Sequence, residues 1–140
     1  MHDFALHPQL SADTRLIGDL PLCRLLLMDD RRFPWCVLVP RRSGLRELHE
    51  LPAAEQTLLL AEINRVSLSL TAHCDAEKLN IGALGNLVPQ LHVHVVGRRQ
   101  DDEAWPGPVW GHGRALAYEE DQATRTISIL QDACGLRPAR

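Results

Sequence analysis

One long helical segment stands between two pairs of short apolar runs, and no other feature constrains the fold of this chain as strongly. Beyond Pro52, apolar residues recur at spacings of three and four until Cys74. This period predicts an amphipathic helix of about five to six turns, and Pro52 suits its start because the missing N–H would have no partner there. The stripe expected to face the core is Leu59, Ile63, Val66 and Leu70, with Glu55, Glu62 and Arg65 on other faces.

The short runs on either side of this segment have the length and composition of strands. Residues 22–28 and 35–40 are separated by a turn that begins with four charged residues, which predicts an antiparallel hairpin. Residues 78–82 and 90–97 are separated by a loop that contains Gly and Asn. We expect these two runs to be neighbouring strands as well.

Less regular segments complete the chain. Residues 8–16 are expected to form a short helix or a capped turn, and residues 119–134 a helix with Ala123, Ile127 and Leu130 on its apolar side. The order of two strands, a helix, two strands and a helix predicts an α+β fold with both helices on one side of an antiparallel sheet. At 140 residues the chain is expected to be a single domain.

Residues 90–97 read Gln-Leu-His-Val-His-Val-Val-Gly and place two imidazoles on an otherwise apolar strand. Because side chains alternate along a strand, Gln90, His92 and His94 share one face. The opposite face carries Leu91, Val93 and Val95. If those residues face the core, the Gln/His face is the other side of the strand. A face that only contacts solvent would more commonly carry Lys, Thr or Glu. We interpret it as a candidate site, with buried structural histidines as the alternative.

A neutral imidazole is a good nucleophile and also works as an acid or base near pH 7. If His92 attacks phosphorus, the charge on the phosphate oxygens needs donors, which Gln90, His94 and the backbone of residues 85–88 can supply. His-x-His also presents two metal ligands, but no third ligand has suitable spacing, and residues 101–103 read as a solvated loop. No metal is therefore expected. A serine or thiol nucleophile is not indicated either, because the sequence contains no Gly-x-Ser-x-Gly elbow.

Composition excludes further classes of function. A net charge of −3 gives no basic field for nucleic-acid binding, so phosphate contacts must be local, as at Arg41-Arg42 or Arg98-Arg99. No segment reaches the roughly 18 apolar residues of a membrane span, and the first residues do not resemble a signal peptide. No membrane partner and a cytoplasmic location are expected. Four scattered cysteines without a C-x-x-C pair are expected to be reduced thiols.

At residues 90–98 the sequence resembles the histidine triad (HIT) family, whose signature is His-φ-His-φ-His-φ-φ with φ apolar. Here it reads Gln-Leu-His-Val-His-Val-Val-Gly-Arg. The strand pair, the long helix, an Asn-x-Gly strand and a Gly-Asn loop follow the family's order over residues 20–99, with residues 100–140 as an extension. The resemblance implies one HIT-like domain over residues 1–140 and, as is usual in the family, a homodimer. The segment Trp-Pro-Gly-Pro-Val-Trp-Gly is similar to one in small bacterial HIT proteins.

The resemblance also implies roles for individual residues. His92 falls on the central histidine, which attacks the α-phosphate and forms a nucleotidyl-histidine intermediate. His94 falls on the last histidine, which donates toward the phosphate or the leaving group. Gly85 and Asn86 fall on the loop beside the phosphate, and Asn80 on the strand that borders the nucleotide pocket.

Gln90 stands where the family usually has the first histidine. Its amide can donate and accept hydrogen bonds but cannot carry a proton, so a step that needs an acid at this position is affected while attack by His92 is not. The implied function is a hydrolase or phosphoramidase for nucleoside phosphate derivatives or dinucleoside polyphosphates, with a small-molecule nucleotide as ligand and no cofactor. A nucleotidyl transferase and a non-enzymatic nucleotide-binding module are the alternatives.

Overall fold

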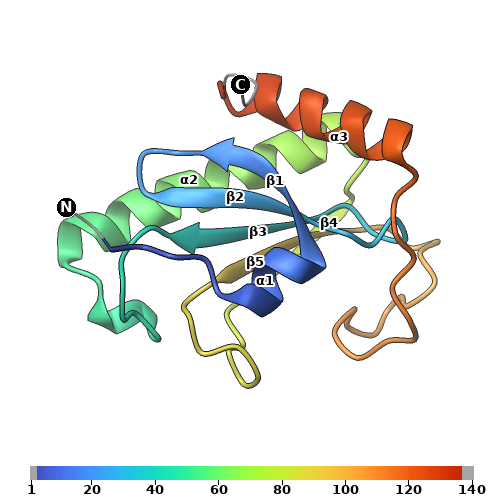
Figure 1. The fold of residues 1–140 in the computed structure, drawn as a ribbon. Coiled ribbons are helices and arrows are strands. Elements are labelled where there is room, and N and C mark those ends of the chain that lie inside the picture. Colours follow the sequence, from blue (N-terminus) through green and yellow to red (C-terminus); the bar gives the residue numbers. More distant parts are fainter. Residues whose placement is uncertain (1–2, 137–140) are drawn as a thin grey trace.

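Within residues 3–136, which the computed structural model describes, five strands form an antiparallel sheet with the order β1-β2-β3-β5-β4 (Figure 1). The strands are β1 (Thr14–Asp19), β2 (Cys23–Met28), β3 (Trp35–Pro40), β4 (Lys78–Gly82) and β5 (Val93–Arg98). The helices are α1 (Pro8–Asp13), the short 3₁₀ helix η1 (Leu48–Glu50), α2 (Ala53–His73) and α3 (Glu120–Ala133). The predicted α+β class and both predicted antiparallel strand pairs are confirmed.

Strand β1 differs from the prediction, which extended a helix or turn over residues 8–16. Helix α1 ends at Asp13, and the Thr14 hydroxyl donates to the Leu10 carbonyl 2.6 Å away. The chain then becomes extended and pairs with β2 at the sheet edge. Ile17 of β1 is fully buried whereas Leu16 is half exposed, which is the alternation of a strand with one face on the core.

One face of the sheet is covered by α2 and α3, which lie next to each other (Figure 1). Leu91, Val93 and Val95 belong to the core beneath these helices. The predicted apolar face of the histidine strand is therefore confirmed, and so is the α2 stripe Leu59, Ile63, Val66 and Leu70.

Glu62 of α2 lies off the predicted apolar stripe, yet it is buried as well. It is 4% exposed, and its carboxylate accepts hydrogen bonds from the backbone N–H groups of Leu22 and Cys23 at 2.8 and 2.9 Å. These two donors lie at the start of β2. A buried carboxylate with two such partners fixes where the long helix crosses the sheet.

The opposite face of the sheet carries a second apolar cluster. Trp35, Val37 and Val39 of β3 lie there with Val96 of β5. His94 shares this face, since it is two residues before Val96. The cluster is completed by α1, by the segment before it and by the long loop after β5, through Leu10, Phe4, Leu6, Ala104 and Val109.

The cysteines of the described chain are free thiols, and burial raises the pKa values of Cys23 and Cys36. No helix between residues 3 and 136 combines the length and apolar character needed to cross a membrane.

Candidate functional site

His92 and His94 lie together at the start of β5, an interior strand between β3 and β4. His94 is paired with Val37 of β3 on one side and with Gly82 of β4 on the other, and His92 directly precedes the strand. Each imidazole residue is 6% exposed. Their ring centroids are 4.9 Å apart in an edge-to-face arrangement. The two histidines that the alternation placed on one face are thus in contact.

The proton of His92 is positioned by the backbone. Nδ1 of His92 lies 2.7 Å from the carbonyl oxygen of Gln90. Because a carbonyl oxygen only accepts hydrogen bonds, Nδ1 is the donor and carries the proton. The lone pair of the neutral ring is consequently on Nε2, which is the tautomer that a nucleophile requires.

The proton of His94 is positioned in the opposite way. Nε1 of Trp35 donates to Nδ1 of His94 at 3.0 Å, in a buried contact. Because an indole N–H can only donate, Nδ1 of His94 is the acceptor, and the proton of the neutral ring is on Nε2. Burial, followed by the neighbouring His92, lowers the pKa of His94 to about 4. His94 is therefore a neutral N–H donor at pH 7.

Trp35 was predicted as a strand residue and not as a site residue. Its register opposite Val96 places it beside the histidine strand, and the sequence does not reveal that β3 and β5 are neighbours. Trp110 from the loop after β5 completes this aromatic group, with its ring edge-on to both Trp35 and His94 at centroid distances of 6.2 and 5.5 Å.

Gln90 does not join the two imidazoles. Its Oε1 accepts from the N–H of His7 at 2.8 Å, and its Nε2 donates to the carbonyl of Ala5 at 2.9 Å. The side chain is thereby tied to the segment before α1. Of the three polar side chains expected to share one face, only the two imidazoles lie together. The Gln90 amide instead satisfies one backbone donor and one backbone acceptor at once.

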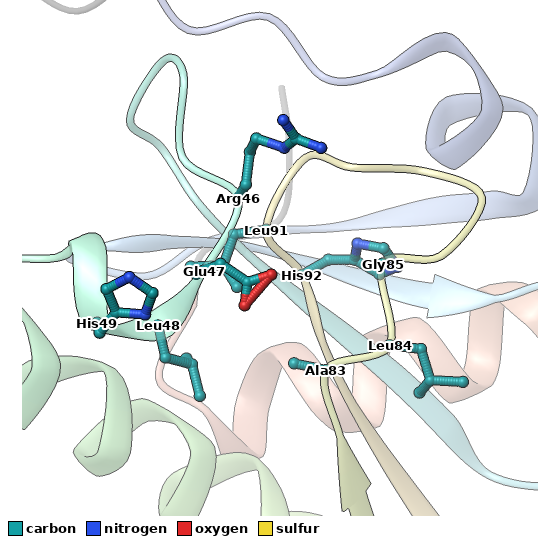
Figure 2. A pocket seen from close by; sticks show the side chains of 9 residues that line it. All are labelled: Arg46, Glu47, Leu48, His49, Ala83, Leu84, Gly85, Leu91 and His92. Carbon is teal, nitrogen blue, oxygen red and sulfur yellow. The ribbon is translucent and has the colours of Figure 1, made fainter.

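Two cavities within the described chain adjoin His92. The larger has a volume of about 610 Å³ and apolar walls that include Trp35, Trp110 and Met28, with Asn86 and His94. The smaller has a volume of about 240 Å³ (Figure 2). The wall that the two cavities share is formed by Leu84, Gly85 and His92.

A model of the HIT domain matches residues 9–101. The chain belongs to the histidine triad family. It is 45% identical to a HIT protein from Sinorhizobium meliloti 1021, with 94% of this chain and 97% of that chain covered and a TM-score of 0.92. It is 46% identical to a histidine triad protein from Bradyrhizobium japonicum, with 94% and 98% covered and a TM-score of 0.91.

A histidine triad protein from Marinobacter aquaeolei VT8 is similar to the same degree, with 45% identity, 94% and 96% coverage and a TM-score of 0.92. No curated protein matches the chain. The HIT fold predicted from the sequence is thereby confirmed.

The loop residues expected beside the phosphate in this HIT domain lie at the cavities. Asn86 lines the larger cavity, and Gly85 lines both. Gly85 has a φ of +69°, which glycine adopts without strain and which lets the loop turn back toward His92.

Asn80 lies on β4, the strand that the resemblance places at the border of the nucleotide pocket. It lines neither of the two cavities beside His92, and its Oδ1 accepts a 2.7 Å hydrogen bond from Arg98. Arg98 is 1% exposed and forms a two-point ion pair with Asp102 at 2.8 and 3.0 Å. The hydrogen bonds from Arg98 lower the pKa of Asp102 to about 2. Asn80 thus belongs to a buried structural network of the HIT domain.

The basic pairs considered as local phosphate contacts also have structural partners. Arg41 donates to the carbonyl of Leu20, and Arg42 pairs with Glu55. Arg99 pairs with Asp101 on the surface. Within residues 3–136 no group of three or more His, Cys, Asp or Glu residues is placed to hold a metal ion.

Proposed function

We propose that this HIT protein transfers a nucleotidyl group through His92 and hydrolyses nucleoside phosphate derivatives, either phosphoramidates or dinucleoside polyphosphates. The observation that carries the proposal is the hydrogen bond from Nδ1 of His92 to the Gln90 carbonyl. It leaves the Nε2 lone pair free at the wall of a cavity large enough for a small-molecule ligand.

In the first step, Nε2 of His92 attacks the phosphorus atom that carries the nucleoside. An N–P bond forms, and the bond from phosphorus to the leaving group breaks with its electron pair on the leaving group. The ring then bears a positive charge, which the Nδ1–H to Gln90 hydrogen bond stabilises. Nε2–H of His94 is a fixed donor for the phosphate oxygens, and it needs no reorganisation as charge develops there.

In the second step, water attacks the same phosphorus atom and the N–P bond breaks. The electron pair returns to Nε2 of His92, the nucleoside monophosphate leaves, and the proton of the water passes to solvent. If an alcohol or a phosphate replaces water, the protein is a nucleotidyl transferase. The same covalent intermediate serves both outcomes.

The larger cavity suits the nucleoside. Its volume of about 610 Å³ lies in the range of small-molecule sites, which are mainly apolar with a few placed polar groups. Trp35, Trp110 and Met28 supply apolar and aromatic walls, and Asn86 supplies a polar group. A planar base is the ligand class that aromatic walls of this kind favour. We further propose that the protein acts as a homodimer, as is usual in the HIT family.

A non-enzymatic nucleotide-binding module is the second candidate, and the position of Gln90 favours it. The amide is held by Ala5 and His7, so no proton carrier stands at the first triad position. Such a protein would keep the cavity and bind nucleotide without turnover.

Intact mass measurement tests the proposal. Wild-type protein is mixed with an adenosine phosphoramidate or a dinucleoside polyphosphate, quenched at alkaline pH and weighed. We expect a nucleotidyl adduct on the wild type and on a His73→Ala control, whose exposed histidine lies at the end of α2, and none on His92→Ala. Equal turnover by wild type and His92→Ala would contradict the proposal. Calorimetric binding of nucleotide without any turnover would favour the binding module.

A further inference from the structure

The smaller cavity beside His92 is walled by a charged loop that the nucleotidyl transfer chemistry above does not use. Figure 2 shows Arg46, Glu47 and His49 on one side of this cavity, and His92 with Gly85 on the other. All three loop residues are exposed to solvent. The cavity therefore offers charged groups to a ligand at the very residue that reacts.

One backbone hydrogen bond joins this loop to the residues that lead into β5, and a side chain of the loop bonds to its own backbone. The carbonyl of Leu45 accepts from the N–H of Leu91 at 2.9 Å, which places the next loop residue beside the residues that lead into β5. The Glu50 carboxylate accepts from the N–H groups of Arg46 and Glu47 at 2.9 and 2.7 Å, and these bonds lower the pKa of Glu50. These hydrogen bonds connect the loop to the residues before β5 and to itself.

Arg46 is a cationic group in this wall with unused binding capacity. Within residues 3–136 its backbone N–H has a partner, but its guanidinium has no hydrogen bond or ion pair. Arg42 and Arg98, by contrast, each form an ion pair with a carboxylate. A guanidinium presents five N–H donors in a planar fork that matches a carboxylate or a phosphate.

The volume of the cavity limits what it can hold. At about 240 Å³ it lies below the roughly 300–1,000 Å³ that is usual for drug-sized ligands, whereas the larger cavity lies within that range. The nucleoside therefore belongs in the larger cavity. A group in the smaller one must be considerably smaller than a nucleoside.

We propose that the smaller cavity is a subsite for a small oxyanion, a phosphate or a carboxylate, carried by the part of the substrate that lies beyond the reacting phosphorus, and that Arg46 binds it. This rests on the proposed function of His92. Arg46 is then the residue that determines specificity for anionic leaving groups. Glu47 in the same wall repels an anion, so it restrains binding of highly charged groups.

Anion binding without turnover is the first test. Inorganic phosphate and, separately, acetate are titrated while the ring resonances of His49 and His92 are followed by NMR. Arg46→Gln removes a charge-assisted hydrogen bond, so the affinity for the anion that the subsite binds should fall about tenfold. Glu47→Gln should raise this affinity. Arg125→Gln, on the exposed side of α3, serves as the control and should match the wild type.

The outcomes of this titration are decisive. A tenfold loss seen with phosphate alone or with acetate alone identifies which oxyanion the subsite takes. Equal affinity of wild type and Arg46→Gln for both anions, or no response of the wild type to either, would overturn the proposal.

A kinetic comparison tests the role in catalysis. Two aryl esters of adenosine 5′-phosphate are used, with 4-carboxyphenyl and 4-carbamoylphenyl leaving groups of similar size and different charge. Arg46→Gln should lower kcat/KM about tenfold for the carboxylate ester and less than twofold for the amide. Equal losses would overturn the subsite. If the wild type cleaves neither ester, the proposed nucleotidyl transfer fails, and the titration still decides on the subsite.

Discussion

Nε1 of Trp35 lies 3.0 Å from Nδ1 of His94, and this contact determines which nitrogen of His94 carries the proton. His92 receives its tautomer from a backbone carbonyl instead. The two rings touch, yet they present opposite functions: an unprotonated Nε2 on His92 and a protonated Nε2 on His94. In the proposed reaction, the first imidazole attacks phosphorus and the second donates to the phosphate oxygens.

Trp35→Phe tests this relationship. The variant keeps an aromatic ring in β3 but removes the N–H, so both neutral tautomers of His94 become populated. We expect kcat/KM to fall about tenfold, the cost of one hydrogen bond, and the ¹⁵N resonances of His94 to move toward a mixture of protonated and unprotonated nitrogens. Trp105→Phe, which alters a tryptophan outside both His92 cavities, should leave these resonances unchanged. An unaltered Nε2–H tautomer in Trp35→Phe would contradict the assignment.

The depressed pKa of His94 predicts a pH-dependent stability. The unfolded chain takes up a proton at this histidine below its ordinary value of 6.5, whereas the folded chain does so only at about 4. The stabilisation is complete above pH 6.5 and is lost as the pH falls through this window, by about 3 kcal/mol in all. Denaturant unfolding from pH 7 to pH 4 should therefore be less pH-dependent in His94→Gln. Parallel curves would show that His94 does not titrate in this way.

Removal of the Gln90 side chain should release the segment before α1. Gln90→Ala loses the hydrogen bonds to His7 N–H and Ala5 carbonyl, at about 1 kcal/mol for a typical bond. Hydrogen exchange of the His7 amide should then accelerate by about tenfold. Gln100→Ala, at an exposed position, should leave that exchange rate as it is in the wild type. Unchanged protection of His7 in Gln90→Ala would mean that other contacts hold the segment.

The buried pair Arg98–Asp102 should be important for folding rather than for catalysis. Asp102→Asn leaves the buried guanidinium without its counter-charge, and we expect the free energy of unfolding to fall by about 3 kcal/mol as measured with denaturant. Asp101→Asn breaks a solvent-exposed pair with Arg99 and should not shift the unfolding midpoint. If both variants unfold at the wild-type midpoint, the pair contributes nothing to stability.

The parts of the fold that were predictable are those with a clear period. The α2 stripe and the alternation around His94 follow from spacing alone, because burial imposes periods of 3.6 and 2. Strand β1 was missed because Thr14 to Asp19 is a short edge strand whose pairing with β2 depends on long-range contacts. The burial of Glu62 was not predicted because its backbone partners lie some 40 positions away in the sequence.

The candidate site was predictable only within its own strand. His92 and His94 share a face for a local reason, but the partners that set their tautomers depend on how the strands are ordered and on backbone geometry. Trp35 reaches His94 because β3 lies beside β5. Arg46 reaches the neighbourhood of His92 because Leu45 pairs with Leu91. Neither adjacency leaves a local signal in the sequence.

The wall formed by Leu84, Gly85 and His92 has a cavity on each side. If a ligand on one side displaces this wall, the space on the other side changes and the two binding events are coupled. Such a coupling is reciprocal: the factor by which an anion in the smaller cavity alters nucleotide affinity equals the factor by which nucleotide alters anion affinity. If that factor strengthens binding, each ligand would raise the affinity for the other. If it weakens binding, each ligand would lower it.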